Sequence, residues 1–233
     1  MSAIRYDLGS DQILTLTIDM PGQSANTMTS EFRESLAETT AKVKSDLAGI
    51  RGIIIASAKK TFFAGGDLKE LHQVTQEHAQ TFEEMVNDLK GHMRFLETCG
   101  KPVVAAINGT ALGGGLEIAL ACHHRVVLDD NSIKLGLPEV TLGLLPGGGG
   151  TQRLPRMIGL EAAFPFLMEG KQISPKAALK AGIINELADS PEDMMTKARA
   201  FIDANPACQQ PWDKKGFKFP GGAPHHPVMA QKL

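Results

Sequence analysis

Apolar residues alternate with polar ones between positions 12 and 20, and the apolar set falls on one side of the chain: Leu14, Leu16, Ile18 and Met20. A period of two residues predicts a half-buried β-strand. Three later runs, at residues 52–57, 102–107 and 125–128, are almost continuously apolar. Short runs of this kind are typical of strands that are buried on both faces.

Between the strand patterns, apolar residues recur at helical spacing. One stripe consists of Phe32, Leu36, Val43 and Leu47, and a second consists of Phe82, Met85, Leu89, Met93 and Leu96. These stripes predict two amphipathic helices, the first beginning near Thr29 or Ser30, which are residue types that cap helices. A further helix is expected over residues 191–205. Because strands alternate with helices, the chain is predicted to form an α/β domain.

Composition narrows the class of protein. A chain of 233 residues favours one large domain, with two small ones as the alternative, and 42% hydrophobic with 21% charged residues is ordinary for a globular protein. The net charge of -2 gives no indication of a nucleic-acid-binding surface. Three cysteines without a CxxC spacing or a secretory signal favour a reducing cytoplasm. No apolar stretch reaches about 18 residues, so no transmembrane segment is predicted.

Candidate chemistry gathers around glycine-rich turns. Gly113-Gly114-Gly115 is followed by Leu116-Glu117, and Pro138-Glu139 comes 22 residues after Glu117. A glycine turn that opens a helix presents unpaired N–H groups to a developing negative charge, and Glu117 would lie one turn into that helix. Isolated glycines usually serve close packing, and Glu139 alone would read as a surface carboxylate. A glutamate in an apolar helix is different, because burying it needs a reason.

Four blocks in order carry a family resemblance: residues 63–68 (FAGGDL), residues 108–117 (NGTALGGGLE), Pro138-Glu139, and residues 146–154 (PGGGGTQRL). Over about residues 10–190 the chain resembles the crotonase (enoyl-CoA hydratase/isomerase) family. The resemblance implies a crotonase-like ββα spiral with a short irregular C-terminal tail. The apolar pattern alone does not distinguish this spiral from an open doubly wound sheet.

The resemblance also implies a reaction, the hydration of trans-2-enoyl-CoA to 3-hydroxyacyl-CoA in fatty-acid β-oxidation. The backbone N–H groups of Gly66 and Gly114 would form the oxyanion hole. Glu117 would activate water, and Glu139 would donate a proton to C2 and could also support Δ3,Δ2-isomerisation. Two nearby carboxyls in an apolar pocket do not both ionise easily, so one pKa is expected to be raised. Rival activities are isomerisation alone, thioester hydrolysis, and non-catalytic acyl-CoA binding.

By the same resemblance, two loops would contact coenzyme A through a set of five residues: Ala25, Ala64, Asp67, Leu68 and Lys69. A helix cap at Asp67 and a solvated charge at Lys69 are the plainer alternatives. No GxGxxG follows a strand, so no NAD site is expected in this chain. His123-His124 has no further ligand at a recognisable spacing, so we expect a structural role and no metal. No cofactor is expected beyond the thioester substrate itself.

The end of the sequence differs in character, with five prolines after position 205. We expect a domain over residues 1–205 and a linker-like tail over 206–233, either ordered on contact or loose. Residues 212–218 resemble the region that follows the hydratase domain in multifunctional fatty-acid oxidation enzymes. That resemblance implies a continuation into a 3-hydroxyacyl-CoA dehydrogenase domain and a thiolase β subunit as partner. We do not expect within these 233 residues the helices that such families use for trimer packing and pocket closure.

Overall fold

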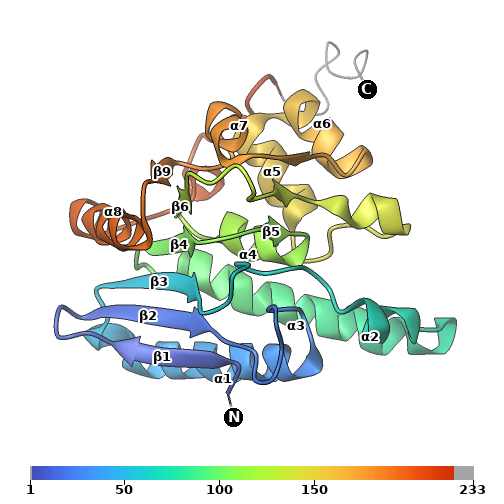
Figure 1. Cartoon of the computed structure of the whole chain (residues 1–233), viewed down its shortest axis with the longest axis horizontal. Coiled ribbons are helices and arrows are strands. Elements are labelled where there is room, and N and C mark those ends of the chain that lie inside the picture. Colours follow the sequence, from blue (N-terminus) through green and yellow to red (C-terminus); the bar gives the residue numbers. More distant parts are fainter. Residues whose placement is uncertain (1, 223–233) are drawn as a thin grey trace.

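A six-stranded sheet forms the centre of the molecule. The computed structural model describes residues 2–222, apart from the side chain of Lys69. The strands lie in the order β1 (Ile4–Leu8), β2 (Ile13–Ile18), β3 (Gly52–Ser57), β4 (Val103–Ile107), β6 (His124–Leu128) and β9 (Glu186–Ala188). Only the β1–β2 pair is antiparallel. The strands predicted from apolar patterns are thus confirmed, and Figure 1 shows their arrangement.

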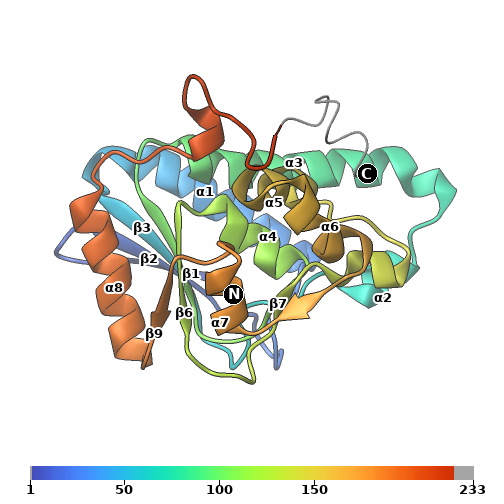
Figure 2. The same cartoon turned by 90° about the horizontal axis from the view of Figure 1, so that it is seen from above.

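Helices cover both faces of this sheet. One face packs against α1 (Ser30–Asp46), α3 (Ala79–Thr98) and α4 (Gly114–Ala121), and the other face packs against α8 (Pro191–Ala204). Figure 2 shows α8 on one side of the strands and the other three helices opposite. Since β3, β4 and β6 are buried on both sides, their continuous apolar runs are explained. The Thr29 side chain accepts a hydrogen bond from Phe32 N–H and caps α1, as expected.

A second, smaller sheet decides the topology. It consists of β5 (Ala111–Leu112), β7 (Leu135–Gly136) and β8 (Gln172–Ile173). The remaining helices between the strands are short, and those labelled η are 3₁₀-helices: η1 (Leu47–Gly49), α2 (Leu68–His72), η2 (Gln76–His78), η3 (Pro138–Leu142), α5 (Gly150–Ile158), α6 (Leu160–Met168) and α7 (Pro175–Lys180). The chain leaves the main sheet after β4, enters the second sheet at β5 and returns through α4 to β6. This winding of the chain between the two sheets is the expected ββα spiral. It excludes the alternative fold, an open doubly wound sheet.

Arg125 fixes the end of α4 against the sheet. Its buried guanidinium donates to the carbonyl oxygens of Ala119 and Cys122 at distances of 3.3 and 2.6 Å, and its Nε donates to Ile183 O at 2.8 Å. Helix carbonyls at a C-terminus lack partners inside the helix, and a cation beside them is favourable. The helix that carries Glu117 is therefore held at its far end.

The described part of the tail, residues 206–222, makes contact with the domain. Gln210 Nε2 donates to Cys122 O at 3.1 Å, and Asp213 in η4 (Pro211–Asp213) forms an ion pair with Arg94 at 2.5 Å. Residues 210 and 213 of this segment therefore lie against the domain. Residues 223–233 lie outside the described part of the chain. Within the described part, no helix has both the length and the apolar character needed to cross a membrane.

Candidate active site

The first turn of α4 lies where loops from both sheets meet. Its N-cap, Gly113, has φ 54° and ψ −126°, a conformation that glycine adopts easily and other residues do not. A side chain on Gly115 would place its Cβ 2.3 Å from the carbonyl oxygen of Phe63. The glycine run therefore allows α4 to begin in direct contact with the loop that follows β3.

Glu117 is buried one turn into α4, where 3% of it is exposed. Its Oε2 accepts a hydrogen bond from Gly148 N–H at 2.9 Å, and its Oε1 accepts one from Gly150 N–H at 2.7 Å. Burial raises the pKa of Glu117, while the two amide hydrogen bonds and the nearby charge of Arg153 act in the opposite direction. The glycine turn at residues 148–150 thus forms an amide cradle for this carboxylate.

Glu139 has a different environment in η3. Burial is the main cause that raises its pKa to about 7, and the negative charge of Glu117 raises it further. Its Oε2 is buried and has no hydrogen-bond partner within the described residues. A carboxyl with such a pKa and an unpartnered oxygen is suited to hold and donate a proton near neutral pH.

The two glycines expected to form the oxyanion hole lie in adjacent segments. Leu112 N–H donates to Phe63 O at 3.1 Å, so the loop that contains Gly66 runs beside the start of α4. A Cβ on Gly65 would lie 3.9 Å from the Cα of Gly113. Gly114 is the first residue of α4, whose initial N–H groups have no acceptor inside the helix. The structure brings both loops together beside Glu139.

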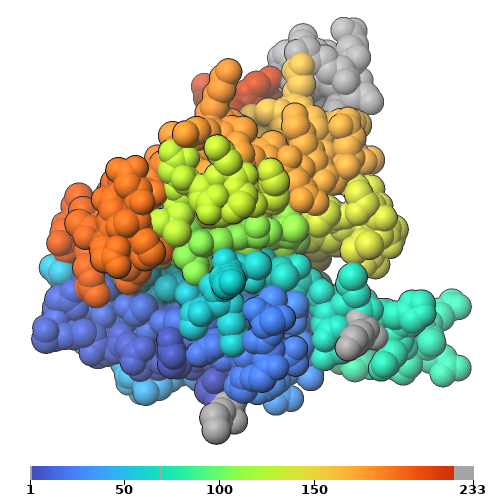
Figure 3. Space-filling view, viewed as in Figure 1, coloured from blue at the N-terminus to red at the C-terminus, as the bar shows by residue number. Residues whose placement is uncertain are grey.

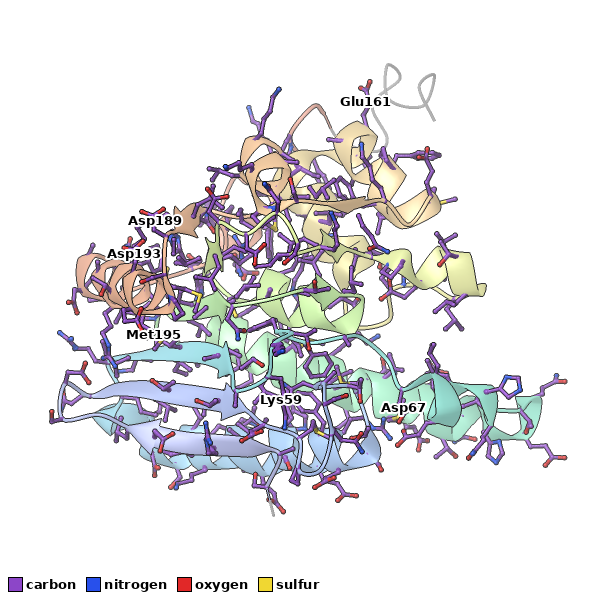
Figure 4. The ribbon with its side chains drawn as sticks, viewed as in Figure 1. Lys59, Asp67, Glu161, Asp189, Asp193 and Met195 are labelled. Atoms are coloured by element: carbon purple, nitrogen blue, oxygen red, sulfur yellow. The ribbon has the colours of Figure 1, made fainter. Side chains whose placement is uncertain are left out.

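The two loops expected to contact coenzyme A also meet. Ala64 N–H donates to Asn26 O at 2.8 Å, and Met28 N–H donates to Gly65 O at 2.9 Å, which brings the loop of Ala25 against that of Ala64. Leu68 begins α2 and is 56% exposed. Figure 4 shows Asp67 beside α2, and its Oδ1 accepts a long 3.4 Å bond from Glu70 N–H. Lys69 belongs to α2, but its side chain lies outside the described part.

The surface near Glu139 is apolar. Leu142, in η3, is 52% exposed, and Leu145, three residues later, is 75% exposed. Figure 3 shows this yellow segment and the teal segment around α2 at the surface on the same end of the molecule. Exposed apolar side chains close to Glu139 favour an apolar ligand over a charged one.

Several residues that shape the site were not predicted. Asn26 is fully buried and holds its loop through Met20 N–H and through the carbonyl oxygens of Ile18 and Phe62. Glu97 and Arg153 form a buried ion pair at 2.8 Å behind the amide cradle. A carboxylate next to Leu96, at the end of the apolar stripe of α3, was the only sequence signal for that pair.

Among residues 2–222, no group of three or more His, Cys, Asp or Glu side chains is placed so that it could hold a metal ion. His123 has the expected structural role: its Nδ1 accepts from Val103 N–H at 3.1 Å, and its Nε2 lies 3.1 Å from Glu97 O. His124 Nε2 lies 2.9 Å from Glu186 Oε1.

Comparisons with known proteins identify the family of this chain. The family model described as enoyl-CoA hydratase/isomerase matches residues 9–205. The fatty acid oxidation complex subunit alpha of Shewanella loihica is 47% identical over 202 residues, covering 84% of this chain and 28% of that protein. The subunit of the same name from Shewanella oneidensis is 48% identical over 181 residues, covering 76% of this chain and 25% of its own length. The chain therefore spans about a quarter of the length of these curated relatives.

Solved structures show the same fold. A crystal structure of enoyl-CoA hydratase from Bacillus anthracis has a TM-score of 0.77 at 32% identity, covering 87% of this chain and 76% of that one. An enoyl-CoA hydratase from Thermoplasma volcanium has a TM-score of 0.75 at 26% identity, with 88% and 77% covered. The α/β spiral thus has experimentally determined counterparts.

Proposed function

Because the chain belongs to the enoyl-CoA hydratase/isomerase family, we propose that it adds water to trans-2-enoyl-CoA to give 3-hydroxyacyl-CoA in fatty-acid β-oxidation. The observation that carries this proposal is the unequal pair of carboxyls. Glu117 is held by two amides, whereas Glu139 has a pKa of about 7 and an oxygen without a hydrogen-bond partner among residues 2–222. One group is arranged as a base and the other as an acid.

In the proposed reaction, Glu117 removes a proton from water, and the water oxygen bonds to C3 of the enoyl group. The electron pair of the C2–C3 double bond moves toward the thioester, and the resulting enolate oxygen accepts hydrogen bonds from Gly66 and Gly114 N–H. Glu139 donates its proton to C2. Proton transfer from Glu117 to Glu139 then restores the pair. The reaction needs no cofactor, and the loops of Ala25, Ala64, Asp67, Leu68 and Lys69 would hold the coenzyme A portion.

The test is hydration of crotonoyl-CoA by this chain, followed as loss of enoyl-thioester absorbance. We expect Glu117→Gln and Glu139→Gln each to lower kcat by about 10²–10⁴-fold, the usual contribution of a general acid or base. Glu31→Gln, an exposed carboxylate in the first turn of α1, is the control. A wild-type chain that binds acyl-CoA but does not hydrate crotonoyl-CoA would refute the hydratase proposal and leave isomerisation alone, thioester hydrolysis or non-catalytic binding.

Isomerisation is the second candidate, and it is favoured by Glu139 Oε2, which has no hydrogen-bond partner in the described part of the chain. A single carboxyl beside an oxyanion hole can move a proton between C2 and C4 of a Δ3-enoyl-CoA. If this chain also isomerises, Glu117→Gln should retain Δ3,Δ2-isomerase turnover while hydration is lost. Loss of both activities in Glu117→Gln would count against this second role.

The wider setting is also a proposal. The relatives are longer than this chain and are by name subunits of a fatty acid oxidation complex, which supports a fused further domain. From the family resemblance we propose that this domain is a 3-hydroxyacyl-CoA dehydrogenase and that the partner is a thiolase β subunit. We propose residues 1–205 as the hydratase domain and 206–233 as its linker. Free thiols at Cys99, Cys122 and Cys208 support a cytoplasmic location. The mass of the native polypeptide tests the continuation, co-purification tests the thiolase partner, limited proteolysis near residue 205 tests the domain bounds, and cell fractionation tests the location.

A further inference from the structure

Arg153 lies behind the amide cradle rather than in the reacting space. It belongs to α5, and 7% of it is exposed. Its Nε and one terminal nitrogen donate to the two carboxylate oxygens of Glu97, at 2.9 and 2.8 Å, in a bidentate pair. The remaining terminal nitrogen donates to the carbonyl oxygen of Gly148 at 2.8 Å.

Gly148 therefore connects Arg153 to Glu117. Its carbonyl oxygen accepts from Arg153, while its N–H donates to Glu117 Oε2. The next residue, Gly149, has φ 106°, and a Cβ there would lie 2.3 Å from Arg153 Nη1. The turn is thus shaped so that the guanidinium can lie directly against it.

Glu97 is fixed from two sides as the anchor of this arrangement. Its side chain is 2% exposed and also receives Arg94 Nη1 at 3.3 Å. His123 Nδ1 accepts from Val103 N–H, so His123 Nε2 carries the proton that is donated to Glu97 O. Because both the backbone and the side chain of Glu97 are held, Arg153 has little freedom to move.

From this geometry we propose that Arg153 is a positioning residue for the Glu117 carboxylate, acting through Gly148 with Glu97 as its anchor. The inference rests on the proposed hydratase function. A buried ion pair is in itself a poor source of stability, and apolar residues of similar size often replace such a pair without loss. What an apolar pair would not supply is the third hydrogen bond, which orients the glycine turn.

The charges around Glu117 define how the proposal can be measured. Arg153 of α5 and Glu139 of η3 are the charged groups that face it, and Glu97 of α3 lies behind Arg153. The loop at 146–150 contributes only amides. Removing the Arg153 charge should therefore raise the pKa of Glu117, and moving the glycine turn should weaken the hydrogen bonds to its carboxylate.

The experiment compares three variants of the full chain. In the double variant Glu97→Met/Arg153→Met both charges are removed, so no unpaired charge is left buried. Arg153→Lys keeps the charge but loses the planar fork. Arg156→Met is the control, since Arg156 lies on the same helix and donates only to Gln152 in the described residues. Crotonoyl-CoA turnover gives kcat and KM, and carboxyl ¹³C NMR in a Glu139→Gln background gives the titration of Glu117.

We expect the double variant to lose about 10²-fold in kcat, as for a misplaced catalytic group, with KM within about twofold of wild type. Its Glu117 should titrate at higher pH than in wild type. Arg153→Lys should lose kcat with little change in that titration, and Arg156→Met should match wild type in both. A folded double variant with wild-type kcat and wild-type titration of Glu117 would overturn the proposal. If the double variant does not fold, a wild-type kcat in Arg153→Lys would overturn the proposal instead.

The two proposals fail in distinguishable ways. A wild-type chain without hydratase turnover refutes the proposed function, yet the titration of Glu117 in the variants still tests the positioning role. Turnover in wild type together with an unchanged double variant refutes the positioning role alone.

Discussion

Glu139 Oε1 lies 2.8 Å from the point that a Cβ atom would occupy on Gly113. The proposed proton donor and the N-cap of the helix that carries Glu117 therefore leave no room for a side chain between them. This close contact between Glu139 and Gly113 joins two elements that are distant in sequence, η3 and α4. The contact fixes the positions of the Glu117 and Glu139 carboxyls relative to the loops of Gly66 and Gly114.

Gly113→Ala should damage both conformation and chemistry. The new methyl group would contact Glu139 Oε1, and φ 54° is unfavourable for alanine. We expect kcat/KM for enoyl-CoA to fall by about 10²-fold, the effect of a misplacement of about 1 Å. Gly143→Ala is the matched control, because Gly143 also has a positive φ of 71° but has no atom within 4 Å of its Cβ position. Equal kinetic losses in the two variants would argue against the contact with Glu139.

Gly148→Ala should disturb Glu117 directly. Its Cβ would lie 2.7 Å from Glu117 Oε2, so the carboxylate must leave the amide cradle. We expect hydration to be reduced by about 10²-fold. At Gly147 the nearest atom is Val86 Cγ1 at an ordinary 3.7 Å, so Gly147→Ala should retain nearly full turnover. Parallel steady-state kinetics of the two alanine variants decide whether the cradle matters.

The pH dependence of hydration should report Glu139. Donation to C2 requires its protonated form, and its pKa is raised to about 7 by burial and by the charge of Glu117. We therefore expect kcat/KM to fall as pH rises through about 7. A profile measured from pH 5 to 9 that stays flat above pH 7 would remove Glu139 as the proton donor.

The same raised pKa predicts the direction of a stability change. Folded Glu139 binds its proton more tightly than the unfolded carboxyl, whose ordinary pKa is 4.5. The contribution of this tighter proton binding to the free energy of unfolding is complete below pH 4.5. It is lost as the pH rises to about 7. Glu139→Gln should therefore raise the free energy of unfolding at pH 8 by about 1 kcal/mol, a value reduced because solvent screens the partly exposed side chain. Urea unfolding should show no such gain at pH 4.

Contact between the tail and α4 gives a prediction that does not depend on catalysis. Gln210 is buried and donates to Ala121 O and Cys122 O, so Gln210→Ala leaves two carbonyl groups without this donor. We expect a loss of about 1–2 kcal/mol in the free energy of unfolding. Gln209→Ala is the matched control, because Gln209 is exposed and its side-chain hydrogen bond among residues 2–222 stays within the tail, to Asp213 O. Similar urea midpoints for the two variants would mean that residues 206–213 do not support the domain.

The sequence determined the local elements well, for a physical reason. Apolar runs such as residues 52–57 predict strands because burial is the main requirement there, and Thr29 predicts a helix start because its side chain caps the first turn. Glu117 was identified for a similar reason, since a carboxylate on an otherwise apolar helix needs a partner. The role of each site residue stays a prediction until the variants are measured.

The tertiary structure alone decided which groups meet. The amides that hold Glu117 come from Gly148 and Gly150, more than 30 residues away, and no local pattern specifies that contact. The apolar patterns fitted both an open sheet and a spiral, because periodicity shows which face of an element is buried but not what buries it. The Glu97–Arg153 pair was missed for the same reason: two charges distant in sequence become partners only when α3 and α5 pack behind one glycine turn.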